Sequence, residues 1–88
     1  IRYSEYENIA MLNDYKDKAK WAWIDTPNIL PINKTNKVYF KKFKTCLVCP
    51  ERWGRKNDIK KYKKYFEKIK FYPTSVMTSI DCVSIWNN

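Results

Sequence analysis

Apolar residues recur every three or four positions near the start of the chain, which is the spacing of an amphipathic helix. Ser4 followed by Glu7 forms a capping-box pattern, and Pro27 prevents a helix from continuing past about Asp25. The spacing therefore predicts a helix from about Ser4 to Trp23. Its apolar face would hold Ile9, Leu12, Tyr15, Ala19, Ala22 and Trp23.

The middle of the chain contains loop and strand signals. Two prolines and three asparagines predict an extended loop over residues 26–36. Residues 37–48 are rich in β-prone side chains and predict a strand, although Lys41 and Lys42 interrupt the alternation and indicate a bend or bulge. We expect three apolar loop residues to pack back onto the core: Ile29, Leu30 and Ile32.

A second helix and a last strand follow. Asn57 and Asp58 offer a helix N-cap, and Pro73 stops the helix. Its apolar positions fall on one arc and most of its lysines on the other side. The apolar positions are Ile59, Tyr62, Tyr65, Phe66 and Ile69. Residues 74–86 then alternate as a final strand, with one face made by Val76, Ile80, Cys82 and Trp86.

These elements predict a small α+β domain with the order α-β-α-β, in which two helices pack on a small sheet. No repeat or low-complexity linker divides the chain, so we expect residues 1–88 to form one domain. A parallel strand pair would make the second helix a right-handed crossover. An antiparallel pair fits the pattern nearly as well.

Two features of the composition exclude most catalytic chemistry. The chain has no histidine, the usual general base near neutral pH and the commonest metal ligand. Its single glycine, Gly54, excludes the Gly-rich loops that hold nucleotide phosphates. We therefore expect a protein that is not an enzyme and that uses no cofactor and no metal. No apolar run is long enough to span a membrane.

The net charge of +9 is concentrated in residues 33–71, which hold fourteen basic and three acidic side chains. A polyanion such as an RNA or DNA backbone would relieve the repulsion between these cations and release counterions. Lysine carries most of the charge and binds as a point charge, so recognition should be weakly sequence-specific. The candidate nucleic-acid-binding residues are Lys41, Lys42, Lys44, Arg52, Arg55, Lys56, Lys60, Lys61, Lys63, Lys64 and Lys68.

Aromatic side chains interleave with these lysines, and such mixtures can stack bases while the lysines bind phosphates. In the competing interpretation the aromatics belong to the core and the lysines form a solvated face. Trp21 lies off the apolar arc of the first predicted helix, and Trp53 lies in a basic loop. Both are candidate partner-interface residues, although Trp53 packed onto the core is the alternative.

The three cysteines leave several interpretations open. Cys46 and Cys49 form a Cys-x-x-Cys pair, but with Cys82 they are one ligand short of a closed zinc site. A disulfide from Cys46 or Cys49 to Cys82 would need an oxidising compartment. Three buried thiols in an intracellular protein are the alternative.

The leading functional hypothesis is a binding or structural protein that contacts a polyanion within a larger assembly. A second is an accessory interaction subunit of a protein complex, such as an organellar one. A third is a secreted, disulfide-containing toxin, effector or surface-antigen fragment, which the sequon at Asn33 would suit. Because the first residue is Ile1, we expect a mature or trimmed chain. The sequence leaves the localisation open and slightly favours an intracellular or organellar compartment over secretion.

Overall fold

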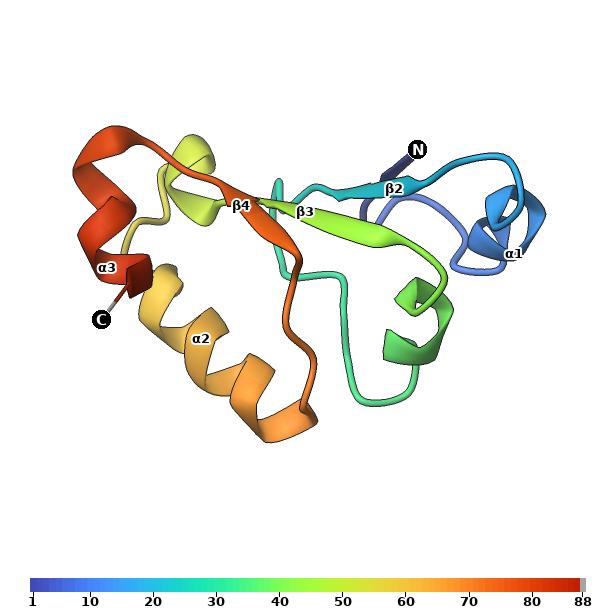
Figure 1. Cartoon of the computed structure of the whole chain (residues 1–88). Coiled ribbons are helices and arrows are strands. Elements are labelled where there is room, and N and C mark those ends of the chain that lie inside the picture. Colours follow the sequence, from blue (N-terminus) through green and yellow to red (C-terminus); the bar gives the residue numbers. More distant parts are fainter. Residues whose placement is uncertain (88) are drawn as a thin grey trace.

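Four short strands form the centre of the computed structural model, which describes residues 1–87 (Figure 1). They pair in chain order, and every neighbouring pair is parallel. The strands are β1 Arg2–Tyr3, β2 Trp21–Ile24, β3 Lys44–Val48 and β4 Ser75–Met77. The α-helices are α1 Met11–Tyr15, α2 Asp58–Ile69 and α3 Val83–Asn87. The 3₁₀ helices are η1 Lys37–Phe40, η2 Pro50–Trp53 and η3 Ile80–Cys82.

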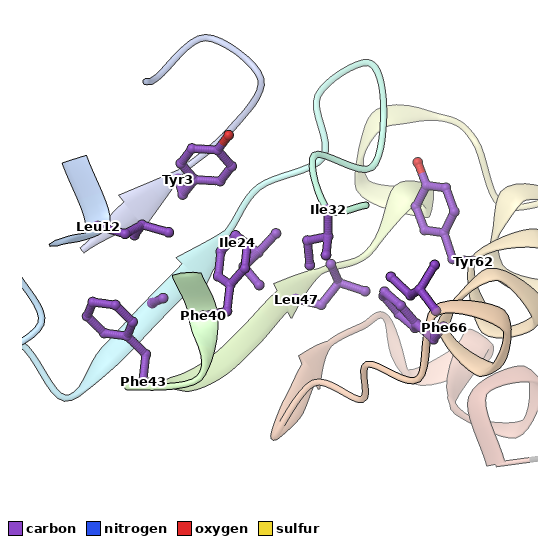
Figure 2. Close-up of a cluster of buried hydrophobic side chains, with 11 residues drawn as sticks. Tyr3, Leu12, Ile24, Ile32, Phe40, Phe43, Leu47, Tyr62 and Phe66 are labelled. Atoms are coloured by element: carbon purple, nitrogen blue, oxygen red, sulfur yellow. The ribbon is translucent and has the colours of Figure 1, made fainter. Parts of the chain in front are cut away.

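The core lies on one face of the sheet. Successive side chains of a strand point to opposite faces of the sheet. On the core face, Ala22 and Ile24 of β2 and Leu47 of β3 are fully buried. Figure 1 shows α2 and η1 on the same side of the sheet. The close-up in Figure 2 shows how β1, β2, β3, α2 and the 26–36 loop contribute to one apolar cluster. This cluster consists of Tyr3, Leu12, Ala22, Ile24, Ile32, Phe40, Phe43, Leu47, Tyr62, Phe66 and Ile69.

The mixture of helix and strand in one small domain is confirmed, and the strand pairing is parallel. The predicted element order is wrong at its beginning, because β1 precedes α1 and β2 follows it. The predicted second helix is confirmed as α2, with Ile59, Tyr62 and Phe66 buried. The helix ends at Lys70, which takes a left-handed conformation with φ 56° and donates its backbone N–H to the Phe66 carbonyl. This end lies shortly before Pro73.

The long first helix predicted over residues 4–23 is wrong. The capping box does form, since the backbone N–H of Ser4 donates to Glu7 Oε2 across 2.9 Å, but the turn ends there. Only Met11–Tyr15 is helical. Residues Trp21–Ile24 instead pair with β1 and β3, and their exposure alternates with period two. Two neighbouring strands therefore override the helical spacing.

Two predicted strands are shorter than expected. Residues 37–40 form η1, and the chain bends at Lys41 and Lys42, as the interrupted alternation predicted, before β3 begins. Beyond β4, residues 80–87 are helical, so the strand predicted over 74–86 is wrong after Met77. Ile80, expected on the buried face, is 93% exposed. Glu51 accepts the backbone N–H of Ser79 across 3.0 Å and fixes the turn that ends the strand.

The 26–36 loop has no helix or strand, as predicted. Ile32 is buried and Leu30 packs against the core. Ile29 was expected to do the same but is 56% exposed. Among residues 1–87, no helix has the length and apolar character needed to cross a membrane.

Candidate nucleic-acid interface

Six lysines from two distant segments line one groove of about 520 Å³ at the amino ends of β2 and β3. The groove forms because the strands are parallel, so the turns that enter them lie at the same edge of the sheet. The backbone N–H of Lys44 donates to the carbonyl of Lys20 across 2.8 Å and holds the two turns together. We call this site the lysine groove; its cations are Lys16, Lys18, Lys20, Lys41, Lys42 and Lys44.

The charge of the lysine groove is strongly one-sided. Asp17 is the one acidic residue that lines it. A concave surface lined by one sign of charge focuses the field and concentrates oppositely charged ligands. Ala19 and Phe43 supply apolar walls between the lysines. The groove is therefore suited to a chain of anionic groups such as phosphodiesters.

Trp21 connects the lysine groove to the sheet. It lies directly opposite Lys44 in the register of β2 and β3, and the Lys44 ammonium lies 5.8 Å from the centroid of the indole. This is the distance of a cation–π contact. Trp21 is still 43% exposed, so a second aromatic ring could stack on it.

The sheet face opposite the core has no helix over β2 in the part of the chain that the structure describes (Figure 1). Trp21 and Trp23 occupy this face, 43% and 39% exposed, because the alternation of β2 buries Ala22 and Ile24 on the other side. In the register of the sheet, Trp23 lies between Arg2 and Cys46, and Cys46 pairs with Ser75. We call this surface the open sheet face; it consists of Arg2, Trp21, Trp23, Lys44, Cys46 and Ser75.

Trp53 lies at the carboxyl end of β2. Its indole N–H donates to Asp25 Oδ1 across 3.1 Å, and Arg2 Nε donates to Asp25 Oδ2 across 3.2 Å. Trp53 is 43% exposed, so it is fixed at one edge rather than packed into the core. The Arg52 guanidinium lies 5.8 Å from the centroid of its ring.

The lysines of α2 lie on a different surface. Lys60, Lys63 and Lys64 line a separate groove with Glu67 and Ile85. The Lys63 ammonium donates to the Ile85 carbonyl across 2.8 Å, which ties α2 to α3. Lys41, Lys42 and Lys44 line the lysine groove instead, so the predicted lysine set is divided between separate grooves. Lys61 and Lys68 are also exposed on α2.

Arg55, one of the predicted nucleic-acid contacts, is engaged inside the protein. Its guanidinium donates to Asp58 across 3.1 Å, to the Tyr62 hydroxyl across 2.6 Å and to the Thr26 carbonyl. Burial alone would lower the pKa of Arg55, but the bonds to Tyr62 and Asp58 outweigh it and raise the pKa. Arg55 thus holds α2 against the end of β2 and has few donors left for a ligand.

Arg52 and Lys56 line a third groove, near the carboxyl ends of β3 and β4, together with Glu51 and Asp81. Its charges are mixed. Burial would raise the pKa of Glu51, but hydrogen bonds from Thr78 and Ser79 lower it, so this carboxylate stays ionised. The groove therefore lacks the uniform positive charge of the lysine groove.

The three cysteines are free thiols in the structure. Cys49 and Cys82 are buried, and Cys46 is half-buried on the open sheet face. Burial, assisted by the charge of Glu51, raises the pKa of Cys49 to about 12, so its thiol is protonated and unreactive at neutral pH. Within residues 1–87, no group of three histidine, cysteine or acidic side chains is placed to hold a metal ion.

The sequence pointed to half of the lysine groove. Lys41, Lys42 and Lys44 were predicted, whereas the turn that contributes the other three lysines was assigned to a helix. Trp23 was also missed, because it was placed on the buried face of that helix. The period-two placement of Trp21 and Trp23 on either side of the small Ala22 was the signal that could have identified both. No family model, curated protein or solved structure matches the chain.

Proposed function

We propose that this chain is a non-enzymatic nucleic-acid-binding protein that holds a phosphodiester backbone in the lysine groove, with little sequence preference, as a component of a larger assembly. The observation that carries the proposal is the convergence of six lysines on one groove lined by a single carboxylate, that of Asp17. Three of those lysines come from a part of the chain, residues 1–32, that has more acidic than basic residues. The high lysine content of the middle segment therefore does not explain the groove.

The geometry favours backbone contacts over base reading. Lysine ammonium groups bind phosphates as point charges, whereas arginine forks discriminate bases. All six cations of the groove are lysines. Arg2, the arginine of the neighbouring open sheet face, has its guanidinium bonded to Glu7 and Asp25. We therefore expect affinity to depend strongly on salt and weakly on sequence.

Charge reversal at two sites tests the location. The variant Lys20→Glu/Lys42→Glu changes the lysine groove, and Lys60→Glu/Lys64→Glu is the matched control, with the same change of net charge on α2. Anisotropy titrations with a labelled 20-nucleotide strand over a range of salt concentrations give the affinity and its salt slope. We expect the first variant to lose at least about tenfold in affinity. The slope of log affinity against log salt concentration should become less steep by about 1.5 to 2.

The control variant should bind within about threefold of the unchanged protein, because only long-range charge differs. Circular dichroism melts establish that both variants fold. Equal losses of affinity in the two variants would mean that the whole charged surface binds, and would contradict the assignment of binding to the lysine groove. An unchanged protein that does not bind nucleic acid at 50 mM salt would overturn the proposed function.

A second function, an interaction subunit of a protein complex, is favoured by one observation. Trp21 and Trp23 are exposed side by side on the same sheet face, and exposed tryptophans are enriched at protein interfaces. Light scattering on the purified chain tests whether this surface joins copies of the chain. A monodisperse monomer at 100 μM would count against self-assembly through it.

A further inference from the structure

We propose that the open sheet face stacks unpaired bases, so that the ligand of this protein is a single strand rather than a duplex. The inference rests on the proposed function, because the lysine groove must hold the backbone. It adds the class of nucleic acid and assigns Trp21 and Trp23 as the stacking residues.

The first argument is continuity between the two surfaces. Lys44 lines the lysine groove and also lies 5.8 Å from the ring of Trp21 on the open sheet face. A phosphate bound by Lys44 therefore places the attached base beside an exposed indole. Indole faces bind bases of any sequence, because every base has a π-face.

The second argument is the spacing of the two tryptophans. Trp21 and Trp23 project from the same side of β2, about 6.6 Å apart along the strand. Stacked bases are separated by about 3.4 Å, so the two side chains are about two stacking layers apart. One unpaired base that lies between the two rings fits this spacing.

The third argument is charge. The cations next to the exposed indoles are Lys44 at Trp21 and Arg52 at Trp53. The nearest carboxylate along β2 is Asp25, which is 8% exposed and accepts bonds from Arg2 and Trp53. A phosphodiester chain that leaves the lysine groove along β2 thus passes Lys44 and then Arg2, whose guanidinium is shared between Asp25 and Glu7.

A duplex cannot use this face in the same way. Its bases are paired and stacked inside, so it offers phosphates to the lysine groove and no free base to Trp21 or Trp23. We expect a duplex to bind with the salt dependence of the groove but without a stacking contribution.

The test separates stacking from phosphate binding with two strands of equal length and charge. One is a twelve-nucleotide thymidine strand; the other carries the same phosphates on abasic sites. The unchanged protein should bind the thymidine strand at least about fivefold more tightly, since one stacked base is worth roughly that much or more. Binding should also quench tryptophan fluorescence.

The variant Trp21→Ala/Trp23→Ala should lose this preference and bind both strands equally, at the affinity that the unchanged protein has for the abasic strand. The conservative variant Trp21→Phe/Trp23→Phe should keep most of it. Trp86→Ala is the matched control, because Trp86 lies on α3 and should leave the preference unchanged. Melting curves identify any variant that fails to fold; if the double alanine variant does, the single variants Trp21→Ala and Trp23→Ala carry the comparison, and each should lose part of the preference.

Two results would overturn the inference while leaving the proposed function intact. One is equal affinity of the unchanged protein for the thymidine and abasic strands. The other is a concentration-dependent dimer of the unchanged protein that is lost in Trp21→Ala/Trp23→Ala, while this variant still prefers the thymidine strand. That result would assign the open sheet face to a second copy of the chain. Loss of binding to both strands in Lys20→Glu/Lys42→Glu reports separately on the lysine groove.

Discussion

The indole N–H of Trp53 donates to Asp25 Oδ1 across 3.1 Å, and this bond joins η2 to the end of β2. The same carboxylate accepts Arg2 Nε at its other oxygen and the backbone N–H of Thr26. Asp25 is 8% exposed. One nearly buried carboxylate therefore ties together the first strand, the second strand and the turn after the third.

Replacing Asp25 with alanine should destabilise the fold by about 1–3 kcal/mol, because three donors lose a charged acceptor, while water reaches the half-exposed Arg2 and Trp53 and replaces part of the loss. Urea denaturation measures the change in the free energy of unfolding. Asp17→Ala is the control, since this carboxylate is exposed and should matter by less than about 0.5 kcal/mol. A loss at Asp25 no larger than that at Asp17 would mean that the bonds contribute little.

Arg55 should prove structural rather than ligand-binding. Arg55→Ala leaves the Tyr62 hydroxyl and the Thr26 carbonyl without their donor, and we expect a loss of about 2–4 kcal/mol in urea denaturation. Lys56→Ala changes an exposed neighbour by the same charge and should cost less than about 0.5 kcal/mol. Under conditions where Arg55→Ala remains folded, its nucleic-acid affinity should match that of Lys56→Ala.

The sequence predicts α2 well and the sheet poorly, for a physical reason. The apolar residues of α2 keep helical spacing over its whole length, and its buried positions Ile59, Tyr62 and Phe66 are those predicted. The strands contain two to five residues each, too few for a period to stand out. Trp21–Ile24 becomes a strand because β1 and β3 lie on either side of it, which local spacing does not reveal.

The lysine groove shows a similar limit. Charge counted along the chain identified Lys41, Lys42 and Lys44, but Lys16, Lys18 and Lys20 lie in a segment with more acids than bases. They meet because parallel register places Trp21 opposite Lys44. A site built from two turns at one edge of a sheet depends on that register, and the sequence left the strand direction open.

Asp17 should weaken nucleic-acid binding in the unchanged protein. It is the one acidic residue that lines the lysine groove, and its charge repels a bound phosphate. We expect Asp17→Asn to raise affinity about twofold or more at low salt, an effect that shrinks as salt screens the charge. Glu67→Gln, on the α2 groove, removes the same charge and should change affinity less. Equal gains in the two variants would indicate a response to net charge alone.

The thiols should differ in accessibility. Cys46 is half-buried, whereas Cys49 and Cys82 are buried, so a maleimide should modify one thiol rapidly in the folded protein and three in urea. Mass spectrometry counts the labels, and Cys46→Ser identifies the fast site. A mass that rises by two hydrogens on reduction of the native protein would instead reveal a disulfide and support the secreted alternative.

Cys49 should make stability fall at alkaline pH. Burial, with the charge of Glu51, raises its folded-state pKa from 9.0 to about 12. Below pH 9 the thiol is protonated in both states, and its contribution to stability is fully present. Between pH 9 and 12 the unfolded chain releases the proton while the folded chain keeps it, so the contribution is lost by up to about 1.4 kcal/mol per pH unit.

The difference in unfolding free energy between the unchanged protein and Cys49→Ala isolates this effect, because lysine and tyrosine titrations are common to both and cancel. We expect that difference to be constant from pH 7 to 8.5 and then to shift in favour of the alanine variant as pH rises to 11. Val48→Ala is the matched control, because Val48 is equally buried and does not titrate. The contrary result is a difference in unfolding free energy for Cys49→Ala that changes with pH no more than the difference for Val48→Ala. It would show that the Cys49 thiolate forms as readily in the folded chain as in the unfolded one.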